Sequence, residues 1–139
     1  MPTAATVFAD TALSARVVIP APASYKMVEG CYVSSATNIT KDLYKTSLDL
    51  SLPKEGYRIL ISEKDGVSAS CSDDAGAFYA LQTLRQLAVP ANGRLVFPCC
   101  EIKDFPRFGW RGVQLDDSRH FFGKAAVKRI IDQMSEYKL

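Results

Sequence analysis

Hydrophobic and polar residues alternate most clearly between residues 57 and 71, in the middle of the chain. The apolar positions of this stretch are Tyr57, Ile59, Ile61, Val67, Ala69 and Cys71. Alternation with a period of two is typical of a strand that buries one face. The dipeptide Asp65-Gly66 between the two runs favours a tight turn. This stretch therefore predicts a β-hairpin.

Weaker patterns indicate further strands on both sides of the hairpin. Residues 17–19 form a short apolar run that stops at Pro20, and residues 26–33 have Gly30 at their centre, which predicts two short strands joined by a turn. From Thr46, three leucines alternate with polar residues and predict a strand with one buried face; they are Leu48, Leu50 and Leu52. Residues 94–97 predict another short strand, and residues 104–108 a linker.

A helix is predicted to follow the hairpin, over residues 76–88. The residues Ser72-Asp73-Asp74 have side chains that can accept bonds from the free N–H groups of a helix start. Apolar residues then recur at spacings of three and four, at Phe78, Leu81, Leu84 and Leu87. Pro90 and Asn92-Gly93 end the pattern.

The pattern in the last quarter of the chain is typical of the beginning of a larger structure. Residues 110–115 are apolar enough to form a strand buried on both faces, and a helix is predicted over residues 124–137. Its apolar stripe is Val127, Ile130, Ile131 and Met134. A parallel strand needs neighbours that this chain does not contain. We therefore expect a flexible lead-in at residues 1–14, an α+β domain at residues 15–104 and an incomplete second domain at residues 105–139.

The composition, net charge and cysteine spacing of the chain disfavour several classes of function. The chain has 139 residues, 47% hydrophobic and 23% charged, and its net charge of +2 is too small to favour nucleic acid as a partner. No apolar run reaches the roughly 18 residues that span a bilayer, and the N-terminus lacks the pattern of a signal peptide. Four cysteines occur without a CxxC pair, which disfavours zinc and predicts buried thiols with at most one disulfide; they are Cys31, Cys71, Cys99 and Cys100.

Two segments carry a resemblance to a known family. Residues 75–87, AGAFYALQTLRQL, resemble the helix motif of the accessory domain that precedes the barrel in the β-N-acetylhexosaminidases of glycoside hydrolase family 20. Residues 105–121, FPRFGWRGVQLDDSRHF, resemble the opening of their catalytic (β/α)8 barrel. The resemblance covers residues 57–139 and implies a sheet with helices packed on it, followed by the first strand and helix of a truncated barrel. The family has a longer segment, with a helix, between Thr40 and Thr46, so either the accessory domain here is a reduced α/β sandwich or a piece of it has been lost.

The resemblance implies an activity that the chain alone is not expected to perform. Family members hydrolyse terminal β-linked N-acetylhexosamine, with the substrate's acetamido group as nucleophile. An Asp orients that group, and the Glu that follows it protonates the leaving oxygen. The chain contains no Asp-Glu pair. We expect glycans and the rest of the barrel as partners, no cofactor or metal, self-association of the isolated chain, and a secreted, periplasmic or lysosomal location. The alternatives are a non-catalytic module that binds glycans or a protein, and a small enzyme that uses His120 and Asp117.

One residue of the chain matches a family residue that contacts substrate. Arg111 corresponds to the arginine that binds the 3- and 4-hydroxyls of the terminal sugar, and a planar guanidinium suits two adjacent hydroxyls. An arginine that packs along the surface or pairs with Asp116 is an equally good explanation of this residue. Asp116, Arg119 and His120 also match family positions and are expected to form a structural polar cluster at the turn. The neighbouring aromatic residues Phe105, Phe108 and Trp110 are expected to pack rather than to stack on sugars.

Overall fold

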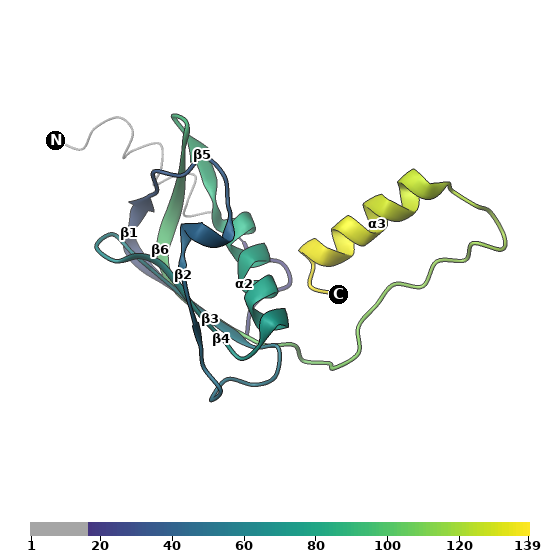
Figure 1. The fold of residues 1–139 in the computed structure, drawn as a ribbon, viewed down its shortest axis with the longest axis horizontal. Helices are drawn as coiled ribbons and strands as arrows, with labels where there is room; N and C mark the ends of the chain where they lie inside the picture. Colours follow the sequence, from purple (N-terminus) through teal and green to yellow (C-terminus); the bar gives the residue numbers. More distant parts are fainter. Residues whose placement is uncertain (1–16) are drawn as a thin grey trace. The chain divides into compact units, whose positions relative to one another are not determined.

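The computed structural model describes residues 17–139, which form a mixed sheet with helices (Figure 1). The strands are β1 (Ser24–Val33), β2 (Lys45–Leu48), β3 (Tyr57–Ser62), β4 (Gly66–Cys71), β5 (Val89–Ala91) and β6 (Arg94–Asp104). The helices are η1 (Lys41–Leu43, a 3-10 turn), α2 (Asp74–Leu87) and α3 (Lys124–Glu136). Contacts between Cα atoms divide the chain into two compact units, which meet in sequence between Pro106 and Arg107.

The first unit is built on a single six-stranded sheet within the described residues. Its strand order is β1-β6-β3-β4-β2, and β5 pairs with the beginning of β6. All pairs are antiparallel except β2 with β4, which is parallel. Helix α2 packs on one face, against β3 and β4 (Figure 1). The predicted α+β class, a sheet with a helix on it, is confirmed.

The central hairpin and the helix after it follow the sequence pattern closely. Strands β3 and β4 pair from Tyr57 opposite Cys71 to Ser62 opposite Gly66, which confirms the predicted hairpin. Every alternate apolar residue of the two strands is buried under α2, which contributes Ala80, Leu81, Leu84 and Leu87 to the same core. Helix α2 begins two residues earlier than predicted. Phe78, expected on the buried stripe, is 43% exposed.

The start of α2 is held by a side-chain cap and by a very close backbone approach. Asp73 Oδ1 accepts a 2.8 Å bond from the Gly76 N–H, and Asp73 Oδ2 accepts a 2.8 Å bond from the Glu55 N–H. A Cβ atom on Gly76 would lie 2.3 Å from the carbonyl oxygen of Gly56. That oxygen also accepts the N–H of Ser72 at 3.0 Å. A side chain at position 76 would therefore push the helix away from the loop before β3.

The N-terminal part of the described chain differs from the prediction. Residues 17–19 form no strand; instead the Gln86 side chain of α2 accepts the Ile19 N–H at 2.7 Å and donates to the Ile19 carbonyl at 2.8 Å. One glutamine thus satisfies both backbone groups that a neighbouring strand would have bonded. The lead-in predicted at residues 1–14 lies outside the described residues.

Two further strands have different limits from those predicted. Strand β1 is one continuous strand of ten residues, with an irregularity near Gly30 where a turn was expected. Strand β2 ends at Leu48 because Asp49 turns the chain, its carboxylate accepting the N–H and the hydroxyl of Ser51 at 3.0 and 2.6 Å. Of the three leucines predicted to share a buried face only Leu52 is buried, while Leu48 and Leu50 are 71% and 80% exposed.

The strand predicted over residues 110–115 is not formed. These residues have no regular secondary structure, and the second unit contains α3 as its regular element within the described residues. A strand exists only when a neighbour takes up its N–H and C=O groups, and the described chain offers none for this segment. Strand β6, by contrast, runs on to Asp104, through residues predicted as the start of a linker. No helix among the described residues is long and apolar enough to cross a bilayer.

The close approach at Gly76 leads to a prediction about stability. Gly76→Ala should lower the free energy of unfolding by about 2–3 kcal/mol, because the added methyl collides with backbone that cannot rotate away. Denaturant titration followed by circular dichroism measures this. Gly109→Ala is the control, since a Cβ atom there meets nothing within 4 Å. Equal stability of Gly76→Ala and the parent chain would contradict the close packing of α2 on this loop.

The cap at Asp73 predicts a pH dependence. The N–H groups of Gly76 and then of Glu55 hold the pKa of Asp73 below its usual value. A carboxyl with a lowered folded-state pKa stabilises the fold above its unfolded pKa of about 3.9 and loses that effect as pH falls through the folded value. Asp73→Asn should therefore be less stable than the parent chain at pH 7, and the difference in Tm should shrink towards pH 2. Asp74→Asn controls for the general loss of charge at the helix start, and a difference that grows on acidification would contradict the assignment.

Candidate functional site

The guanidinium of Arg111 binds backbone carbonyls at two points of the second unit. Its Nε donates to the carbonyl oxygen of Lys138 at 2.9 Å, and its Nη1 donates to that of Phe108 at 2.6 Å. The first bond joins the segment before α3 to Lys138, two residues after the end of the helix. Arg111 therefore lies where the two ends of this unit meet, with its planar fork held in a defined orientation.

Asp116 organises a local turn. One of its carboxylate oxygens accepts the Ser118 hydroxyl at 2.8 Å and the N–H groups of Ser118 and Arg119, each at 3.2 Å. The Ser118 hydroxyl, followed by the Arg119 N–H, lowers the pKa of this exposed carboxyl. The Arg119 guanidinium lies 4.0 Å from Asp116, and both side chains are largely in solvent, so the ion pair adds little stability.

The other members of the predicted cluster are exposed. His120 contacts Phe122 edge-on, with ring centroids 4.9 Å apart. Of the three residues predicted to form a cluster, Asp116 and Arg119 are in contact with each other. Trp110 and Phe108 are 91% and 68% exposed, and the packing predicted for them at the junction of the domains stays a prediction. Such surface is unusual for a complete domain, because large aromatic residues normally bury most of their area.

The first unit contains a buried polar network at the end of β6. The Tyr57 hydroxyl donates to Asp104 Oδ2 at 2.8 Å and lies 2.6 Å from the Thr83 hydroxyl of α2. Burial, followed by the neighbouring charge of Asp104, raises the pKa of Tyr57 far above its usual value, so Tyr57 remains a donor. Asp104 Oδ1 accepts the N–H groups of Ala23 and Phe105. The network ties both the entry to β1 and the exit from β6 to the core.

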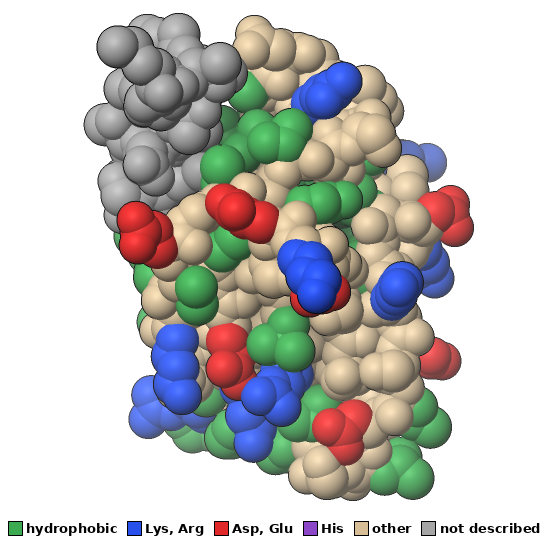
Figure 2. All heavy atoms as spheres, turned by 90° about the vertical axis from the view of Figure 1, so that its left-hand side faces the viewer, with side chains coloured by type: hydrophobic (Ala, Val, Ile, Leu, Met, Phe, Trp, Pro, Cys, Tyr) green, Lys and Arg blue, Asp and Glu red, His purple; other side chains and the backbone are tan. Residues whose placement is uncertain are grey.

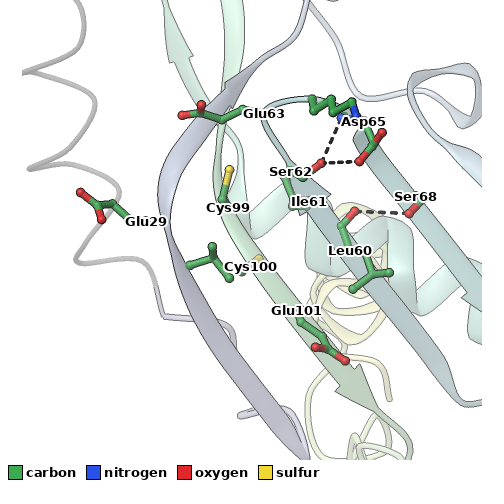
Figure 3. Close-up of a pocket in the computed structure, with 13 residues that line it drawn as sticks. Glu29, Leu60, Ile61, Ser62, Glu63, Asp65, Ser68, Cys99, Cys100 and Glu101 are labelled. Atoms are coloured by element: carbon green, nitrogen blue, oxygen red, sulfur yellow. Dashed lines mark hydrogen bonds between the residues drawn. The ribbon is translucent and has the colours of Figure 1, made fainter. Parts of the chain in front are cut away.

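A groove of about 580 Å³ opens on the face of the sheet turned away from α2 (Figure 3). It is lined mainly by β3, β4 and β6, with Glu63, Cys99 and Glu101 among its residues. Charges of both signs are intermixed over this side of the molecule (Figure 2), and the Arg58 Nε donates to Glu101 Oε1 at 3.1 Å across β3 and β6. The lining of the groove has more acidic than basic side chains and no aromatic ring, which favours neither a nucleic acid nor stacking on a sugar.

None of the four cysteines is in a disulfide in the structure. Cys71 and Cys100 belong to the hydrophobic core under α2, whereas Cys99 is buried outside that core and Cys31 is half-buried. Desolvation raises the pKa of the Cys100 thiol to about 12 and that of Cys71 to about 11, so neither is a reactive thiolate at neutral pH. The described residues bring together no group of three or more side chains that could hold a metal ion.

Two features of the structure were not identified from sequence. The network of Tyr57, Thr83 and Asp104 joins residues far apart along the chain, and Asp104 was assigned only to a linker. The carboxylate of Glu63, at the end of the central hairpin, accepts the Cys31 N–H at 3.2 Å. Gly30 and Pro98 are the residues that mark this irregular part of the ladder in sequence, but neither identifies Glu63 as the partner.

Two sequence models of one family match successive parts of the chain. The model of glycosyl hydrolase family 20, domain 2, matches residues 23–105. The model of the glycosyl hydrolase family 20 catalytic domain matches residues 108–139. The first match alone covers more than half of the chain, and the boundary between the two lies close to the division of the structure into two units.

The curated proteins that are similar to this chain are named as hexosaminidases. The chain is 38% identical over 96 residues to a β-N-acetylhexosaminidase of Cellulomonas fimi, a match covering 68% of this chain and 19% of the relative. It is 42% identical over 97 residues to a β-hexosaminidase of Porphyromonas gingivalis, which covers 65% of this chain and 12% of that protein. The chain thus spans a fifth or less of the length of these two relatives.

Solved structures agree with the sequence matches. A β-N-acetylhexosaminidase from Bacteroides fragilis superposes with a TM-score of 0.80 at 27% identity, over 89% of this chain and 32% of that one. The N-acetyl-β-hexosaminidase of Streptomyces plicatus gives 0.70 at 29% identity, over 87% and 32%. From the two consecutive family matches and the shared fold, the chain belongs to glycoside hydrolase family 20, with the family's α+β accessory domain followed by part of its catalytic domain.

Proposed function

We propose that this chain provides the accessory domain and the start of the catalytic barrel of a β-N-acetylhexosaminidase that removes terminal β-linked N-acetylhexosamine from oligosaccharides or glycoconjugates. The observation that carries the proposal is the unbroken order of the two family matches, residues 23–105 and then 108–139. Residues 15–104 are assigned to the accessory domain and residues 105–139 to the barrel. The relatives that share this region are named as hexosaminidases.

Turnover in this scheme needs groups that the chain does not contain. Cleavage of the glycosidic bond passes through an oxocarbenium-like transition state. The substrate's acetamido oxygen attacks the anomeric carbon, an Asp orients that acetamido group, and the adjacent Glu protonates the leaving oxygen. The sequence has no Asp-Glu pair. The 139 residues alone are therefore proposed to be inactive and to act by supporting and completing the barrel.

Arg111 is the residue of this chain proposed to contact substrate. Its bonds to the carbonyls of Phe108 and Lys138 orient the guanidinium without neutralising its charge. A guanidinium fixed in this way can present N–H groups in one plane to two adjacent hydroxyls, such as the 3- and 4-hydroxyls of a terminal sugar. The role of Asp116, with Arg119, is to shape the neighbouring turn rather than to react, in keeping with its bonds to Ser118.

The second unit presents apolar surface that suits the rest of a barrel. Val113 and Phe121 are 52% and 61% exposed, and α3 contains no fully buried residue although it has an apolar stripe. The remaining strands and helices of a (β/α)8 barrel would cover such surface and supply the neighbours that residues 110–115 require. Self-association of the isolated chain through the same surface stays a prediction.

The decisive experiment compares the chain with its gene. The coding sequence after Leu139 should continue into a strand bearing His and then into an Asp-Glu pair. The protein including that region should hydrolyse an aryl N-acetyl-β-glucosaminide, whereas residues 1–139 should not. A stop codon directly after Leu139 would overturn the proposal for this gene product. Glycan affinity that survives removal of residues 105–139 would instead support a non-catalytic binding module.

The assignment of Arg111 can be tested in the longer protein. Arg111→Ala should lower kcat/KM for the aryl glycoside about 10- to 100-fold, the effect of losing hydrogen bonds from a charged donor to the sugar. Arg111→Lys should recover only part of the loss, because an ammonium cannot bind two hydroxyls in one plane. Arg107→Ala, which removes a guanidinium lying 6.0 Å from the centre of the Phe108 ring, serves as the control. Equal kcat/KM for Arg111→Ala and Arg107→Ala would refute the assignment.

A further inference from the structure

Strand β1 and strand β6 pair with a pronounced irregularity. Met27 lies opposite Cys100, and the next paired residue of β1, Cys31, lies opposite Pro98. Three residues of β1 therefore face one residue of β6, which is Cys99. Proline has no N–H to contribute to the ladder, and Gly30 has a φ of 103°, so both strands are adapted to a bulge at this point.

Glu63 fills the bulge from the turn between β3 and β4. Its Oε1 accepts the Cys31 N–H at 3.2 Å, and a Cβ atom on Gly30 would lie only 2.5 Å from the same oxygen. Cys99 lines the groove beside Glu63 (Figure 3), and the backbone amide of Glu63 hydrogen-bonds the Cys99 sulfur. Cys31 and Cys99 thus share one neighbour, which contacts the first through its carboxylate and the second through its backbone.

The positions of the two cysteines suit a covalent link. Cys99 directly follows the residue that is opposite Cys31. In a regular ladder their Cα atoms would be roughly 6 Å apart, but the two side chains would point to opposite faces of the sheet. Phe97 and Cys100 both belong to the core, so the alternation of β6 breaks between them and leaves Cys99 outside the core, as Cys31 is. Disulfides join Cα atoms about 4.4–6.8 Å apart. Cys71 and Cys100 belong to the core on the α2 side of the sheet.

We propose that Cys31 and Cys99 form a reversible disulfide across the β1–β6 bulge, with a small-molecule disulfide of the glutathione type as oxidant. The Cys31 thiolate attacks one sulfur of the oxidant, and a mixed disulfide forms as one small thiol leaves. The Cys99 thiol then loses its proton and attacks the Cys31 sulfur, which releases the second small thiol. Two protein thiols are oxidised, and one small disulfide is reduced to two thiols.

The order of attack follows from exposure. Cys31 is half-buried and can meet the oxidant, whereas Cys99 is 2% exposed. Desolvation, followed by the charge of Glu63, raises the pKa of the Cys99 thiol, so little of it is thiolate at neutral pH. Cys99 is thus suited to the second step, in which its partner sulfur is already beside it and no external molecule needs to enter.

Peptide mapping of the 139-residue chain tests this pairing. The chain is equilibrated in buffers of increasing oxidised to reduced glutathione ratio, blocked with an alkylating reagent and digested with trypsin without reduction. We expect residues 27–41 linked to residues 95–103, with the mass of two hydrogens lost, and reversal by dithiothreitol. Closing the link should raise Tm by about 5 °C or more, since a long loop of the unfolded chain is constrained.

Single variants identify the sulfurs, because residues 95–103 contain both Cys99 and Cys100. Cys31→Ser and Cys99→Ala should each abolish the linked peptide, and Cys100→Ala should keep it. Circular dichroism shows which variants fold, and fragmentation of the linked peptide by mass spectrometry distinguishes Cys99 from Cys100 if a β6 variant does not. Four alkylated thiols at every glutathione ratio, a glutathione adduct on Cys31 alone, or a link that persists in Cys99→Ala would overturn the proposal. None of these measurements depends on hexosaminidase activity.

Discussion

The buried hydroxyl of Tyr57 is the contact on which the arrangement of the first unit depends. Its proton goes to Asp104, so the Thr83 hydroxyl donates to its oxygen, and one side chain thereby joins β3, α2 and the end of β6. Because the hydroxyls of Tyr57 and Thr83 are out of water, losing either bond would leave an unsatisfied buried group, which costs more than the bond itself contributes. Asp104 extends the same network to the backbone before β1, at Ala23, and after β6, at Phe105, so the core determines where the chain leaves the domain.

The parts of the fold that were predictable are those whose causes are local in sequence. Alternation through β3 and β4 and the capping residue Asp73 require only neighbouring residues, and the hairpin and α2 were identified from them. The continuous β1 and the long β6 depend on pairing between segments far apart in the sequence, and Glu63 reaches the β1 bulge from a turn more than thirty residues away. Neither strand's own pattern contains that information, so β1 was divided and β6 was shortened.

The candidate site also has one part that could be predicted from the sequence and another that could not. The turn at Asp116 is local, since its acceptor and the Ser118 donor are two residues apart. The position of Arg111 came from a family resemblance, and its actual partners, two backbone carbonyls, could not be read from the sequence. Residues 110–115 have a strand's composition without a strand's structure, because hydrogen bonding in a parallel sheet is a property of several segments at once.

The place of β6 in the sheet has a mechanical consequence. This strand is bonded along both edges, to β1 on one side and to β3 and β5 on the other, and its last residue leads through two further residues into the second unit. A pull along the axis of β6 would load many ladder bonds together in shear. A peripheral strand pulled at right angles would release its bonds one after another. The connection between the domains is therefore anchored in a strand that resists traction along its axis.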